Sequence, residues 1–258
     1  MRLLSLLLPL IMLVGCAQTA LVSRDALTRT DKYDLQSRVN IRMELASAYY
    51  AEGQYATALQ EIDRVIAINP AEANAHGLRG LSLMQLGDDG QAEISLRTSL
   101  NLDADNPELN NNMGWFLCQR QSPSKAMPYF IRALSINTYT SPAKALLNAG
   151  LCSKRGGDIA SAESYLLRAL KAEPGLTLAH ATLANIYYDR ADYKSARQHI
   201  LSVVETEQIA ADNLLMAIRI ERKLGDRVAE HSLAAKLRRL YPDSPQTATY
   251  FSGETDER

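Results

Sequence analysis

The chain has 258 residues, with 28 Lys or Arg against 29 Asp or Glu, so its formal net charge is −1. A nucleic-acid-binding surface normally shows as a basic excess or stripe, and this balance therefore argues against a nucleic-acid partner. Hydrophobic residues make up 47% of the sequence and charged residues 22%, a composition that supports a packed core and excludes a disordered chain. Three cysteines are too few for a disulfide scaffold.

The first fifteen residues have the pattern of an export signal. Arg2 supplies a positive charge, and residues 3–14 are almost wholly apolar. About twelve residues in a helix span roughly 18 Å, which is too short for a bilayer core of about 30 Å. We therefore predict that residues 1–15 are a signal peptide and not a transmembrane helix.

The end of this signal, Leu13-Val14-Gly15-Cys16, resembles the lipobox of bacterial lipoproteins. The resemblance implies cleavage before Cys16, diacylglycerol on its sulfur and acylation of its amino group, which together make a stable membrane anchor. The alternative is an ordinary signal peptide followed by a chance cysteine. The residue after the cysteine is Ala17 and not Asp, which resembles the outer-membrane sorting signal. We expect residues 16–38 to be the lipidated cysteine and a tether, with the chain facing the periplasm.

Small residues recur through the rest of the sequence with a period of 34, interrupted by one interval of 36. Three ladders share this period and the same two-residue insertion: Ala58, Ala92, Ala126, Ala162, Ala196; Gly53, Gly87, Gln121, Gly157, Ala191, Gly225; and Ala46, Gly80, Gly114, Gly150, Ala184. Thirty-four residues is the period of the tetratricopeptide repeat (TPR), a pair of antiparallel helices. Small residues in such a pair allow the two backbones to approach closely.

The register of these ladders gives six units: 39–72, 73–106, 107–142, 143–176, 177–210 and 211–244. One unit cannot bury its own apolar face, so stacking of the units must supply the core. We therefore predict an all-α TPR solenoid, a right-handed superhelix of six helix–turn–helix repeats over residues 39–244. The first helix of each unit should line its concave surface. Residues 245–258 are expected to be a flexible tail.

The sequence contains no pattern typical of catalysis. His76 and His180 occupy the same repeat position three units apart, and no histidine pair has helical metal-ligand spacing with a supporting Cys or carboxylate. Gly156-Gly157 is not followed by the Lys-Ser/Thr of a phosphate-binding loop. A Cys–His catalytic pair would need an enclosed pocket, which a solenoid does not offer. We expect no enzyme activity, no cofactor or metal, and no small-molecule substrate.

Two cysteines remain besides Cys16. Cys118 is the twelfth residue of unit 107–142 and Cys152 the tenth of unit 143–176, so both lie on first helices of adjacent units at nearly equal height. An oxidising compartment would allow a disulfide, provided that the Cα atoms come within about 7 Å. The alternative is two reduced, buried cysteines that pack as small hydrophobic residues.

Positions 2, 5, 9 and 12 of each first helix are expected to face the concave side. They predict an apolar groove over the first three units, in which a glycine without a side chain leaves a hollow. Such a groove suits an amphipathic helix or an extended peptide, although each residue could instead pack against a neighbouring repeat. No basic clamp for a chaperone tail is found in register. The groove residues are Met43, Tyr50, Gly77, Leu81, Met84, Asn111 and Trp115.

Four segments give the chain a close resemblance to the PilF/PilW family of type IV pilus biogenesis and stability lipoproteins. They are residues 111–118, 145–152, 214–219 and 237–242, and the first, with Asn-Asn-x-Gly-x-Phe-Leu-Cys, is the most specific. Met113 departs from it, because an aromatic residue is common there. Family members act as pilotins, outer-membrane lipoproteins that help the pilus secretin to reach or assemble in the outer membrane. The resemblance implies this function and partner, and a disulfide between Cys118 and Cys152.

Two other functions fit a TPR lipoprotein. One is a scaffold for periplasmic cell-wall hydrolases or proteases. Another is a component of the outer-membrane β-barrel insertion machinery, although those lipoproteins carry fewer and less regular repeats.

Overall fold

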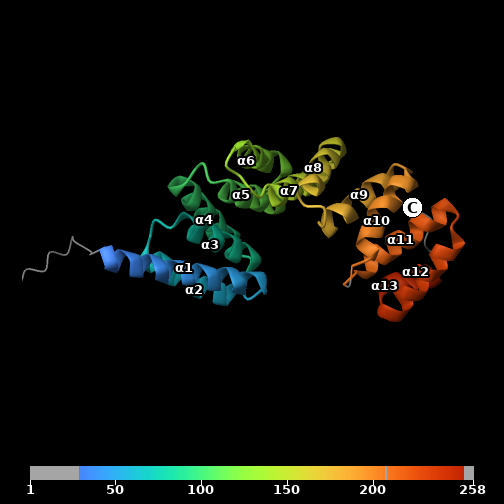
Figure 1. The fold of residues 1–258 in the computed structure, drawn as a ribbon, viewed down its shortest axis with the longest axis horizontal. Helices are drawn as coiled ribbons and strands as arrows, with labels where there is room; N and C mark the ends of the chain where they lie inside the picture. Colours follow the sequence, from blue (N-terminus) through green and yellow to red (C-terminus); the bar gives the residue numbers. More distant parts are fainter. Residues whose placement is uncertain (1–28, 207, 253–258) are drawn as a thin grey trace, which may run out of the picture.

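The computed structural model describes residues 29–206 and 208–252 and shows an elongated, curved array of helices (Figure 1). Within these residues all regular structure is helical, so the predicted all-α TPR array is confirmed. The signal peptide and Cys16 lie outside the described residues. The helices are α1 (Arg29–Ala51), α2 (Tyr55–Ile68), α3 (Ala73–Gln85), α4 (Asp89–Leu102), α5 (Pro107–Arg120), α6 (Pro123–Ser135), α7 (Ala143–Arg155), α8 (Ile159–Ala172), α9 (Thr177–Asp189), α10 (Tyr193–Val204), α11 (Ala211–Leu224), α12 (Arg227–Leu240) and α13 (Pro245–Phe251).

The first twelve helices form six antiparallel pairs, and in the first five pairs the two helices touch where the first carries a small residue. In the sixth pair that position is Ile218, and the small residue is Ala234 of the second helix. At Gly114 an added Cβ would lie 2.8 Å from the Phe130 ring, and at Gly150 it would lie 2.7 Å from Leu166 Cγ. Both large side chains are fully buried. The ladder of small residues therefore exists because a large residue of the second helix fills the space that they leave.

The turn inside four of the pairs is made by a glycine with φ between 76° and 84°. In the fifth pair Ala191 takes the same position at φ 60°, and it is the one non-glycine residue with positive φ in the described part of the chain. An aspartate next to each of three such turns caps the following helix: Asp88, Asp158 and Asp226 accept from the backbone N–H of Gln91, Ser161 and Ala229. In these three units the turn and the cap together fix where the second helix begins.

The predicted tether is wrong for residues 29–38, because α1 begins at Arg29. No Gly or Pro occurs between residues 29 and 52, so nothing interrupts the helix before the first turn. None of the helices in the described residues is both long and apolar enough to cross a membrane.

The predicted flexible tail is wrong for residues 245–251, which form α13. Ser244 caps this helix by accepting from the Thr247 N–H, and Pro245 occupies its first turn. Thr247 is buried and donates its hydroxyl to the Tyr241 carbonyl at 2.6 Å. α13 packs against α11 and α12, where a seventh unit would begin, and closes the C-terminal end of the array.

Replacing Ala191 by Gly should raise the free energy of unfolding by about 1 kcal/mol, because a left-handed residue with a Cβ costs about 1–2 kcal/mol. Gly87→Ala is the matched control: its φ is 84° and an added Cβ meets nothing within 4 Å, so only backbone strain acts. It should lower stability by a similar amount. Denaturant unfolding measures both, and an Ala191→Gly variant less stable than wild type would contradict this account.

Candidate partner-binding surface

The predicted concave groove is only partly open. Met43, Tyr50 and Trp115 remain partly exposed, whereas Leu81 and Met84 are 8% and 3% exposed and belong to the core. The edge of the Tyr50 ring meets Tyr55 at a centroid distance of 5.3 Å, and burial raises the pKa of Tyr50. A partner at this surface would therefore meet isolated aromatic and sulfur-containing side chains and not a continuous groove.

The expected hollow at Gly77 does not exist. A Cβ added there would lie 2.5 Å from Leu109 Cδ2 and 3.6 Å from Asn112 Nδ2, so residues of the next unit fill the space. Gly77 is absent from the surface because the neighbouring first helix packs directly on it.

Asn111 also belongs to the interior of the array. It is fully buried, and its Oδ1 accepts a hydrogen bond of 2.9 Å from Nδ2 of Asn148. The two amides link α5 to α7, the first helices of neighbouring units. Asn111 therefore positions the repeats and does not offer its side chain to a partner.

A different apolar surface is open at the N-terminal end of the array. Ile41, Leu45 and Ala48 lie along one side of α1 at helical spacing, and Ile41 and Leu45 are 55% and 44% exposed. We call these three residues the open end face. They occupy positions 3, 7 and 10 of the first unit.

In three of the inner repeats the preceding unit covers the same three positions. In units three, four and five every residue there is at most 2% exposed: Leu109, Met113, Phe116; Ala145, Ala149, Cys152; and Ala179, Leu183, Ile186. Among the described residues no helix precedes the first unit, and its equivalent face is exposed there. The groove predicted from the sequence does not include this face, although the repeat register and the apolar residues at Ile41 and Leu45 contain the signal.

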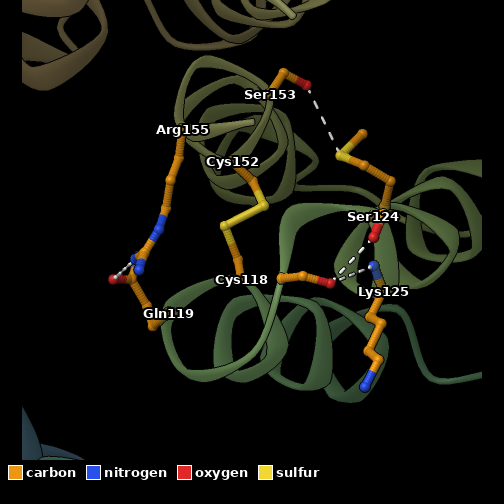
Figure 2. The surroundings of a disulfide bond; sticks show 9 residues. Cys118, Gln119, Ser124, Lys125, Cys152, Ser153 and Arg155 are labelled. Carbon is orange, nitrogen blue, oxygen red and sulfur yellow. Dashed lines mark hydrogen bonds between the residues drawn. A yellow bond between two sulfur atoms is a disulfide. The ribbon is translucent and has the colours of Figure 1, made fainter. Parts of the chain in front are cut away.

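A disulfide links two neighbouring units in the middle of the array. Cys118 of α5 and Cys152 of α7 are bonded, with their Cα atoms 5.9 Å apart, and both are buried (Figure 2). Beside them, Arg155 donates to Gln119 Oε1 at 3.0 Å across the same joint. The bond ties units three and four, between which the two-residue insertion lies.

Comparison with known proteins agrees with this architecture. Tetratricopeptide repeat families match residues 43–107 and 143–175. The type IV pilus assembly protein PilF of Pseudomonas aeruginosa is 25% identical over 216 residues, which cover 84% of this chain and 85% of PilF. The crystal structure of PilW, a type IV pilus biogenesis factor, is 32% identical with a TM-score of 0.73, and the match covers 83% of this chain and 98% of PilW. The chain belongs to the PilF/PilW family.

As a member of the PilF/PilW family, the chain is a TPR protein of type IV pilus biogenesis. A solved structure of P. aeruginosa PilF has the same fold, with a TM-score of 0.76 over 85% of this chain and 99% of that one, at 23% identity. Among the described residues of this family member, no three His, Cys, Asp or Glu side chains converge as metal ligands.

Replacing both Cys118 and Cys152 by Ala should lower the free energy of unfolding by about 3–4 kcal/mol, because the bond closes a loop of 34 residues in the unfolded chain. Denaturant unfolding without reductant measures the difference. A reducing agent should bring the wild-type midpoint close to that of the variant and leave the variant unchanged. Equal midpoints for the oxidised wild type and the variant would contradict a stabilising bond.

Proposed function

We propose that the chain is a non-catalytic pilotin, an outer-membrane lipoprotein that binds the type IV pilus secretin while the secretin is transported or assembled. The observation that carries the proposal is the open end face on α1. It is a helix surface of the kind that units three, four and five bury, left exposed at one end of the array. Exposed apolar faces of this kind mark sites of protein interaction.

We expect the helix that covers this face to come from another polypeptide. In the inner units the preceding repeat covers the equivalent face: Leu109 packs on Gly77, and Cys152 is bonded to Cys118. The twelve residues between Cys16 and α1 are fewer than the 14 residues of a second helix such as α2. We therefore expect the partner segment to be an amphipathic helix of the secretin.

The lipid anchor at Cys16 supports the same assignment. Twelve residues reach at most about 40 Å, whatever their conformation. An acylated Cys16 therefore keeps α1, and with it the open end face, close to the membrane in which the secretin assembles. The closed end at α13 lies at the opposite end of the array (Figure 1).

An Ile41→Glu, Leu45→Glu variant should lose secretin binding, because two charges would be buried without partners at the contact. Ile131→Glu, Leu167→Glu is the matched control, since Ile131 and Leu167 are 55% and 42% exposed on second helices. It should bind as wild type does. Binding is measured by recovery of secretin from envelope extracts, and function by secretin multimers and twitching motility in strains that carry each variant.

Equal secretin recovery by the two double variants would contradict a contact at the open end face. Recovery of a cell-wall hydrolase or protease with wild type, and of no secretin, would favour the scaffold function instead. Thermal unfolding of both variants tests that neither loses its fold.

Growth on labelled palmitate should label the wild-type chain and not a Cys16→Ser variant, because the acyl chains require the sulfur of Cys16. Cys118→Ser controls for the loss of a cysteine and should keep the label. Membrane fractionation should recover the wild type with the outer membrane and release the Cys16→Ser variant from it. Equal labelling of the wild type and Cys16→Ser would contradict the lipid anchor.

A further inference from the structure

Two histidines of the fifth repeat face each other between α9 and α10. The Nδ1 atoms of His180 and His199 are 3.0 Å apart, and the ring centroids are 5.2 Å apart. Nε2 of His180 lies 3.0 Å from the Pro174 carbonyl oxygen. A carbonyl can only accept, so Nε2 carries the proton and Nδ1 of His180 has a free lone pair directed at His199.

The contact with the proline carbonyl is a feature of the repeat, but the facing imidazole is not. His76 is the equivalent of His180 in the second unit, and its Nε2 lies 2.9 Å from the Pro70 carbonyl. The residue nineteen positions later is Ser95, whose hydroxyl accepts from Arg79 at 2.9 Å. Only the fifth unit therefore places a second histidine opposite the oriented first one.

Tyr187 packs on the second histidine of the pair. Its ring stacks on His199 at a centroid distance of 5.5 Å, and its hydroxyl donates to Glu163 at 2.8 Å. Glu163 also pairs with Arg190. A metal ion binds the lone pair of a neutral imidazole, and the Nδ1 atoms of His180 and His199 already face each other.

We propose that His180 and His199 chelate a divalent transition-metal ion, with Zn²⁺ as the probe ion, through their two Nδ1 atoms. Zn–N bonds of about 2.0–2.1 Å in tetrahedral geometry place two nitrogens about 3.3 Å apart, close to the 3.0 Å found here. No third His, Cys, Asp or Glu joins the pair among the described residues, so water fills the remaining positions.

Binding requires one rearrangement and no net loss of protons. His199 now donates its Nδ1–H to His180, so its proton must leave Nδ1 and another must be taken up at Nε2. The proton on Nε2 of His180 stays on that nitrogen and keeps its hydrogen bond to the Pro174 carbonyl, as the second ring N–H of a metal-binding histidine usually does. The ion would then fasten α9 to α10 within the fifth repeat.

Calorimetric titration of Zn²⁺ into the purified full-length chain, in detergent and without a histidine tag, tests the proposal. Wild type should bind one ion per chain. His180→Phe and His199→Phe should each weaken binding by at least about tenfold. His199→Phe keeps a ring for Tyr187 to stack on. His76→Phe is the matched control, because it loses the same proline contact in another unit and should bind as wild type does.

The tautomer of His199 gives a second readout that needs no variant. Nitrogen NMR of the imidazoles should show Zn²⁺ moving the His199 proton from Nδ1 to Nε2, with His76 unchanged. Absence of Zn²⁺ binding by the wild type would overturn the proposal, and so would unchanged binding in either unit-five variant. An equal loss in His76→Phe, or Zn²⁺ binding without a change at His199, would overturn it as well.

Discussion

Within the first five repeats, the first helix approaches the second at a residue with little or no side chain, and a large side chain of the second helix occupies the gap. Gly114 with Phe130 and Gly150 with Leu166 show the pairing most clearly. These contacts set the angle and spacing inside a pair, and therefore the face that the pair presents to its neighbours. The inter-unit contacts follow from this geometry, including the Asn111–Asn148 link and the disulfide of Cys118 and Cys152.

A stack built in this way has two different ends. Each inner unit is covered on both sides, but the first unit is covered on one, and α13 covers the last. The C-terminal end is closed because Pro245, Ser244 and Thr247 make a short capped helix that reaches α11 and α12. At the N-terminal end the described residues include no such cap, and the apolar side chains of Ile41 and Leu45 are exposed. An asymmetric stack thus has a site for a further helix at the end that the proposed anchor holds near the membrane.

Much of this fold could be predicted from sequence, because the ladders of small residues report the helix crossings directly. The site was harder to predict. The missing side chain of Gly77 predicts a hollow. In the structure the next unit packs closely against Gly77 instead, and Leu109 fills the space. Leu81 and Met84 were placed on the surface because helical periodicity gives the direction of a side chain and not the depth to which its neighbours bury it. α13 was missed because seven residues are too few to show a period.

The repeats also allow one position to be compared with itself in different surroundings. His76 and His180 occupy the same repeat position, and each lies against the carbonyl of a proline six residues before it. Nineteen residues after the histidine, the second unit has Ser95 and the fifth unit has His199. This one difference separates an isolated histidine from a facing pair. The same comparison separates Ile41 from Leu109, which differ in whether a preceding unit exists. In a solenoid, the structural role that a position has in most units is known from those units. A unit that departs from that role, by an exposed apolar face or by a second imidazole, is where a function specific to that unit is to be sought.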